Sequence, residues 1–187
     1  MDYQQSRAYI RDAEQYAGGA LDLTNIKEIM KRLGNPQDQL KYVHVAGTNG
    51  KGSVIAYLYT TLTNAGYHVG RYISPSVYSY REKIEVEGTP ISREQFAKHT
   101  TRVAAVIEEM TAEGLAHPTP FEIETAVAFL FFAEEKCDPV ILEVGMGGIT
   151  DATNLIRTTE LAVLVPISMD HQSFLGNTIA EIAEKKA

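Results

Sequence analysis

The sequence predicts an α/β protein with a doubly wound, mostly parallel sheet that carries helices on both faces. Two apolar segments, PVILEV (139–144) and LAVLVPI (161–167), are continuous rather than alternating. Such segments are typical of strands that are buried on both faces. Segments with helical spacing of apolar residues separate the expected strands, as in a series of β–α–β units. A glycine-rich turn, AGTNGKGS (46–53), joins an expected strand to an expected helix.

Local signals predict each element in chain order. Short amphipathic helices are expected over 5–16 and 24–33, and Gly34 with Pro36 ends the second. Ser92 and Gln95 have the spacing of a capping box at the start of a helix. The remaining elements are strands over 41–46, 67–73 and 81–91 (with a turn at Gly88), and helices over 52–64, from Ser92 to about Glu113, over 121–136, and from about Asn177 to the end.

Composition narrows the classes of function. The 187 residues are enough for one sizeable core. A net charge of -7 argues against a nucleic-acid partner. Cys137 is the single cysteine, so no intrachain disulfide is expected and a reducing cytoplasm fits. The polar start does not resemble a signal peptide, and no apolar stretch has the length of a membrane span. We therefore expect a cytoplasmic protein without a membrane partner; its oligomeric state stays open.

The loops at the carboxyl ends of parallel strands are the expected ligand-binding region. These are the loops after residues 46, 73, 144 and 167. In the first loop, glycines let backbone N–H groups turn toward one point, and the following helix offers its positive end to an anion. The residues expected to bind a nucleotide phosphate in this way are Gly47, Thr48, Asn49, Gly50, Lys51, Gly52 and Ser53.

Within this loop, Lys51 is placed to reach the outer phosphates, and Thr48 or Ser53 offers a hydroxyl to phosphate or metal. The pattern departs from G-x-x-x-x-G-K-[ST], because Val45 stands in the first glycine position and Gly52 follows the lysine. The alternative is a glycine-rich turn that merely carries an exposed lysine.

The other loops supply further candidates. Glu143 lies near the end of a buried strand, where a carboxylate is costly unless it is paired or bound to a cation. Magnesium is the natural partner beside a nucleotide, and pairing with a lysine is the alternative. His171 follows Asp170 just past the last strand, and a lone histidine is more often structural. Ser74 could equally be an ordinary turn serine, and Phe121 an apolar staple at a helix start.

These segments together resemble the folylpolyglutamate synthase and dihydrofolate synthase family, relatives of the Mur ligases. The resemblance implies a P-loop-containing, Mur ligase-like ATPase fold. The segments that carry it are LGNPQ (33–37), HVAGTNGKGSV (44–54), ISP (73–75), PFEIETAVAFLFF (120–132), LEVGMGGITDATN (142–154) and MDHQSFLGNTIAEIAEKKA (169–187).

The resemblance implies an ATP-dependent amide ligase that uses Mg²⁺. ATP would phosphorylate a carboxylate of folate or dihydropteroate, and the amino group of glutamate would attack the acyl phosphate. By family likeness, Ser74 and Glu143 would bind one magnesium ion and His171 would help to bind a second. Lys186 matches a lysine that is carbamylated in the family, and with Lys51, Glu143 and His171 it completes the expected catalytic set.

Phe121 and Asp151 match positions that lie near the pterin ring in relatives. The sequence also departs from the family pattern. Ile149 and Thr150 follow the Gly-Gly pair where Arg-Leu is frequent, and Ser76 stands where histidine is frequent. The family segment N-E-R-I reads R-E-K-I at 81–84. These departures leave open the choice between folate and dihydropteroate.

Family members are much longer than this chain. Residues 1–187 are therefore expected to form an incomplete ATP-binding domain, without the C-terminal domain that helps to bind glutamate. Such a chain is expected to bind nucleotide weakly and not to ligate. Two other functions stay open: a Mur-type ligase acting on a cell-wall peptide precursor, and a P-loop nucleotide-binding module without ligase chemistry.

Overall fold

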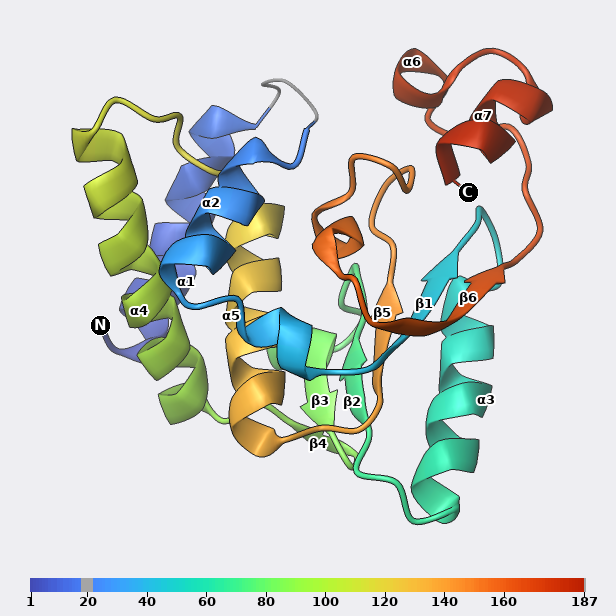
Figure 1. Cartoon of the computed structure of the whole chain (residues 1–187), viewed down its shortest axis with the longest axis horizontal. Helices are drawn as coiled ribbons and strands as arrows, with labels where there is room; N and C mark the ends of the chain where they lie inside the picture. Colours follow the sequence, from blue (N-terminus) through green and yellow to red (C-terminus); the bar gives the residue numbers. More distant parts are fainter. Residues whose placement is uncertain (18–21, 187) are drawn as a thin grey trace.

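A computed structural model describes residues 1–17 and 22–186 (Figure 1). A six-stranded sheet lies at its centre, in the order β4-β3-β2-β5-β1-β6. The strands are β1 (Tyr42–Ala46), β2 (Gly70–Tyr72), β3 (Ile84–Val86), β4 (Thr89–Pro90), β5 (Val140–Glu143) and β6 (Thr159–Leu164). The α-helices are α1 (Tyr3–Asp12), α2 (Thr24–Arg32), α3 (Lys51–Asn64), α4 (Arg93–Ala112), α5 (Pro120–Glu135), α6 (Gln172–Leu175) and α7 (Ile179–Lys186). Short 3₁₀ turns are η1 (Ala13–Tyr16), η2 (Pro36–Gln39), η3 (Tyr80–Lys83) and η4 (Ala152–Leu155).

Helices cover both faces of the sheet, as the sequence predicts. Helices α1, α2, α4 and α5 gather on one face, and α3 packs on the other (Figure 1). Successive residues of β1 point to opposite faces, so Tyr42 joins the larger core while Val43 and Val45 join the smaller one under α3. The predicted doubly wound α/β fold is therefore confirmed.

Four strands of the sheet are parallel. β5 lies between β2 and β1, and β6 pairs with the other side of β1. β3 and β4 form an antiparallel hairpin at the opposite edge, with positive φ angles at Glu87 and Gly88 where the turn was expected. The loops that follow β1, β5 and β6 all begin at the carboxyl ends of the parallel strands, at the top of Figure 1. This arrangement brings segments far apart in the sequence to one place.

Helix α5 is buried almost all round because it lies between the sheet and the other helices of the larger core (Figure 1). Pro120 occupies its first turn, where the missing N–H costs nothing. Thr119 and Glu122 form a reciprocal capping box at its start. The sequence therefore fixes the start of α5 beside the sheet edge that carries the loops.

The prediction that 161–167 is a strand buried on both faces is wrong. The strand runs from Thr159 to Leu164 and is mostly exposed, with Leu161 at 48% and Leu164 at 51%. It pairs only with β1 in the part of the chain that the structure describes. An apolar run reports strand propensity and not position, so it does not distinguish a central strand from an edge strand.

Other boundaries differ by a few residues. The first predicted helix, 5–16, is an α-helix to Asp12 followed by a 3₁₀ turn, and the strand predicted over 67–73 covers only Gly70–Tyr72. Helix α6 was not anticipated, because four residues are too few for a periodic pattern. None of the helices in 1–17 and 22–186 combines the length and the hydrophobicity that a membrane-spanning helix requires.

His99 is a buried polar residue in the larger core whose burial costs free energy. It is completely buried on α4, and neither ring nitrogen has a hydrogen-bond partner among the described residues. Its Nε2 lies 3.8 Å from Glu134 Oε2, too far for a hydrogen bond. Burial lowers the pKa of His99 to about 4, against the opposing effect of Glu134.

We expect His99→Leu to stabilise the protein, because two buried polar atoms without partners are removed. The gain should grow as the pH falls. Below pH 6.5 the unfolded wild-type chain takes up a proton that the native state, with a His99 pKa of about 4, refuses. At pH 5 this adds on the order of 2 kcal/mol to the advantage of the variant. Urea denaturation of both proteins at pH 7 and pH 5 measures it; the same pH dependence in both would contradict the account.

Candidate active site

The glycine loop lies between the end of β1 and the first residue of α3. Gly50 adopts a left-handed conformation as the residue before the helix, with φ of 93°. Gly47 has a φ of 139°, and a side chain there would come within 2.7 Å of the carbonyl oxygen of Val165. These two glycines let the chain turn sharply while it touches the segment after β6. As at the start of any α-helix, the first N–H groups of α3 have no partners within the helix.

Two residues of the loop fasten it to the segment that follows β6. The backbone N–H groups of Thr48 and Asn49 donate to the carbonyl of Pro166 at 3.1 and 3.4 Å. The Thr48 hydroxyl exchanges hydrogen bonds with the backbone of Ser168, at 3.2 and 3.3 Å, and Asn49 donates to the Ser168 hydroxyl at 3.3 Å. Thr48 and Asn49 therefore hold the shape of the loop, whereas Gly52 and Ser53 lie at its open side, where a side chain added at Gly52 would meet nothing within 4 Å.

Lys51, Glu143 and Ser74 come together at the end of the sheet. Lys51 Nζ donates to the carbonyl of Gly47 at 3.2 Å and lies 3.8 Å from Glu143 Oε1. The other carboxylate oxygen of Glu143 accepts from the backbone N–H of Ser74 at 3.0 Å. Burial raises the pKa of Glu143, and the Ser74 N–H and Lys51 oppose that rise. The buried carboxylate at the end of β5 is thus contacted by the start of α3, which follows β1, and by the loop after β2.

Lys186 approaches the same loop from α7. Its side chain is 3% exposed, and Nζ donates to the carbonyl of Gly47 at 3.2 Å and lies 3.5 Å from Asp170 Oδ2. The other oxygen of Asp170 is 3.4 Å from Nε2 of His171, whose side chain is 48% exposed. A buried ammonium needs such partners because its charge is costly to desolvate. His171 therefore reaches the site through Asp170 and does not contact Glu143.

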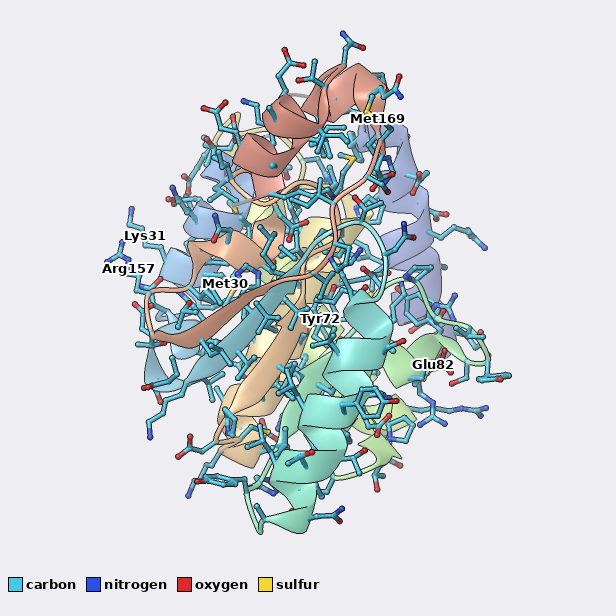
Figure 2. The ribbon with its side chains drawn as sticks, turned by 90° about the vertical axis from the view of Figure 1, so that its right-hand side faces the viewer. Met30, Lys31, Tyr72, Glu82, Arg157 and Met169 are labelled. Atoms are coloured by element: carbon cyan, nitrogen blue, oxygen red, sulfur yellow. The ribbon has the colours of Figure 1, made fainter. Side chains whose placement is uncertain are left out.

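A cavity of about 400 Å³ opens beside these residues. Ser74, Phe121 and Asp151 all line it, so one expected metal residue and both expected substrate residues share this cavity, whereas Glu143 and His171 do not line it. The Phe121 ring stacks on Tyr72, with centroids 6.1 Å apart and planes 29° apart. Tyr72 is completely buried, and Figure 2 shows it in the interior of the molecule. The cavity thus has an aromatic wall suited to a flat ligand.

The carboxylate of Asp151 lines the cavity, but both of its oxygens already accept hydrogen bonds from the protein. One carboxylate oxygen accepts from the backbone N–H of Met146 at 2.9 Å, and the other accepts from the N–H of Thr153 at 3.0 Å and from its hydroxyl. Burial raises the pKa of Asp151, and these hydrogen bonds oppose it. Asp151 therefore braces the second glycine loop beneath Phe121.

Sequence reasoning missed one charged pair beside the cavity, Lys83 with Glu124. Lys83 Nζ donates to both carboxylate oxygens of Glu124, at 2.8 and 3.0 Å, although the two residues are 41 positions apart. One signal was present: Glu124 interrupts the apolar helix sequence FEIETAVAFLFF, where a charge must find a partner.

The fold and the site define an α/β domain in which a glycine-rich loop joins a parallel strand to the start of a helix. The chain belongs to the Mur ligase family: residues 45–187 match the Mur ligase middle domain. It is 42% identical over 186 residues to the dihydrofolate synthase/folylpolyglutamate synthase of Bacillus subtilis (strain 168). This alignment covers 99% of this chain and 43% of that protein. The resemblance noted in the sequence is thereby confirmed.

Solved structures agree with this placement. An FPGS–AMPPCP complex matches with a TM-score of 0.91 and 37% identity, over 100% of this chain and 45% of the other. An FPGS–AMPPCP–folate complex matches with a TM-score of 0.91 and 36% identity over the same shares. The chain thus spans less than half the length of the relatives it matches.

Proposed function

We propose that this chain is the ATP-binding portion of a ligase that adds glutamate to folate or dihydropteroate. The observation that carries the proposal is the meeting of Lys51, Glu143 and Ser74, because Ser74 also lines the aromatic-walled cavity. A phosphate held by the glycine loop would there face a substrate held by the cavity. The relatives named above, one of them solved with a nucleotide analogue and folate, support the same assignment.

In the proposed reaction, a substrate carboxylate oxygen attacks the γ-phosphorus of ATP, and ADP leaves. The amino nitrogen of glutamate then attacks the acyl carbon; phosphate leaves and the nitrogen loses a proton. Lys51 and the N–H groups that begin α3 face the charge that accumulates on the transferred phosphoryl group. Lys186 and Asp170 hold the Gly47 carbonyl side of the loop in place for this step.

The residues present fit a magnesium ion. No group of three or more His, Cys, Asp or Glu in the described ranges is arranged to hold a metal by itself. Mg²⁺ does not need one, because it keeps waters and binds through one or two protein oxygens together with phosphates. We propose that Ser74 and Glu143 supply those oxygens and that His171 helps to hold a second ion. The bound metal would neutralise phosphate charge.

The proposal also includes glutamate as the second substrate and a cytoplasmic location. It leaves open whether the pterin substrate is folate or dihydropteroate. This chain covers 43% of the Bacillus subtilis relative, so ligation is proposed for the whole protein, and nucleotide binding and pterin binding are the steps proposed for residues 1–187.

The proposal is tested by coupling between the two ligands. The affinity of the chain for a non-hydrolysable ATP analogue is measured by calorimetry under three conditions: without a second ligand, with dihydropteroate or folate, and with a cell-wall peptide precursor. We expect only the pterin compounds to change the affinity for nucleotide, because their site borders Ser74. Coupling to the peptide precursor instead would favour a Mur-type peptide ligase, and coupling to neither would favour a nucleotide-binding module.

A further inference from the structure

The cavity beside the glycine loop holds one cation, Lys83, among the described residues that line it. The Lys83 side chain is only 16% exposed and Glu124 is 9% exposed, so the pair is shielded from water. Tyr80 completes the group: its hydroxyl donates to the same carboxylate, and its ring centroid lies 4.6 Å from Lys83 Nζ. Three side chains from two elements therefore fix the position of one ammonium group.

The ammonium of lysine has three N–H donors. Two of them point to the oxygens of Glu124 at 2.8 and 3.0 Å. No other acceptor in residues 1–17 and 22–186 lies within hydrogen-bonding distance of Lys83 Nζ, although the residue lines the cavity. One donor is therefore left for a ligand.

The acidic side chains of Asp151 and Glu122 in the cavity wall already accept hydrogen bonds from the protein. Both oxygens of Asp151 accept backbone N–H groups, and one oxygen of Glu122 accepts from Thr119 in the capping box. The charge of Lys83 is balanced by Glu124, so the spare donor suits a neutral acceptor better than a second carboxylate. Phe121, stacked on Tyr72, supplies the flat apolar surface beside it.

We propose that Lys83 is a specificity-determining residue of this cavity. It donates a hydrogen bond to a carbonyl oxygen or an unprotonated ring nitrogen on the edge of a flat heteroaromatic group that packs on Phe121. Glu124 and Tyr80 are positioning residues that hold the ammonium for this contact. The inference rests on the proposed function, since the heteroaromatic group would belong to the folate or dihydropteroate substrate.

The test compares two ligands of the same shape. Pteroate carries acceptors on its ring edge, whereas an analogue with naphthalene in place of the pterin has none. The chain and the double variant Lys83→Met/Glu124→Gln are titrated with each, in the presence of a non-hydrolysable ATP analogue. The double variant is used because Lys83→Met alone would leave a buried carboxylate unpaired and destabilise the fold.

We expect the double variant to lose about 10-fold or more in affinity for pteroate and to keep its affinity for the naphthalene analogue. Lys83→Arg, which keeps the charge and the partner, should retain part of the preference for pteroate. An equal loss for both ligands, or no loss for either, would overturn the inference and leave the proposed function standing. Failure of the wild-type chain to bind pteroate while it binds nucleotide would overturn the inference and the folate assignment together.

Discussion

We expect replacement of Lys51 with alanine to lower the affinity for a non-hydrolysable ATP analogue by about 100-fold, equivalent to ~3 kcal/mol. Lys51 is the loop cation nearest the buried carboxylate, with Nζ 3.8 Å from Glu143 Oε1. Its side chain is 16% exposed, so its interaction with phosphate is screened little by solvent. A fluorescent ATP analogue, titrated into wild type and variant at the same ionic strength, measures the change.

Lys41→Ala is the matched control for this variant. Lys41 is exposed and directly precedes β1, so it lies at the opposite end of that strand from the glycine loop, and its replacement removes the same charge from the protein. The affinity of this variant for nucleotide should stay within about twofold of wild type, since screening removes most of the effect of a distant surface charge. Equal losses for Lys41→Ala and Lys51→Ala would mean that only net charge matters, and the loop would not be the phosphate site.

We expect Gly47→Ala to destabilise the protein by about 3 kcal/mol or to prevent folding. The new methyl group would lie 2.7 Å from the carbonyl oxygen of Val165, and φ at this position is 139°, which residues with a side chain rarely adopt. The loop would have to move away from the segment after β6, which would break the hydrogen bonds of Thr48 and Asn49 to Pro166. Thermal and urea denaturation measure the loss.

Gly52→Ala separates stability from binding. An added methyl group at Gly52 meets no protein atom within 4 Å, and alanine favours the first turn of α3 by about 0.5–1 kcal/mol. We expect unchanged or higher stability, together with a loss of about 10-fold in affinity for nucleotide, because the methyl group takes space that phosphate needs. If Gly52→Ala binds nucleotide as well as wild type does, the phosphate does not approach this turn.

The sequence was informative where a pattern is local. The strand, glycine turn and helix around Lys51 are each encoded by neighbouring residues, so both the loop and its position at a strand end could be predicted. The burial of Glu143 followed from the apolar strand that contains it. The capping box at Ser92 also needed only a spacing of three residues.

The rest depends on contacts between distant segments. The exposure of β6 is decided by its place at the edge of the sheet, which no window of sequence contains. The approach of Lys186 to Gly47 spans 139 positions, and here only the family likeness pointed to the residue. The pairing of Lys83 with Glu124 joins a 3₁₀ turn to a helix, so the charge in α5 gave a hint without naming its partner.

The central claim is that the glycine loop, Lys51 and Glu143 form a nucleotide site in this chain. Calorimetric titration of the chain with a non-hydrolysable ATP analogue, with and without Mg²⁺, tests it most directly. The account predicts saturable binding of one nucleotide per chain that is stronger with Mg²⁺. A folded chain, shown by a cooperative thermal transition, that takes up no nucleotide at millimolar concentration with Mg²⁺ present would contradict it.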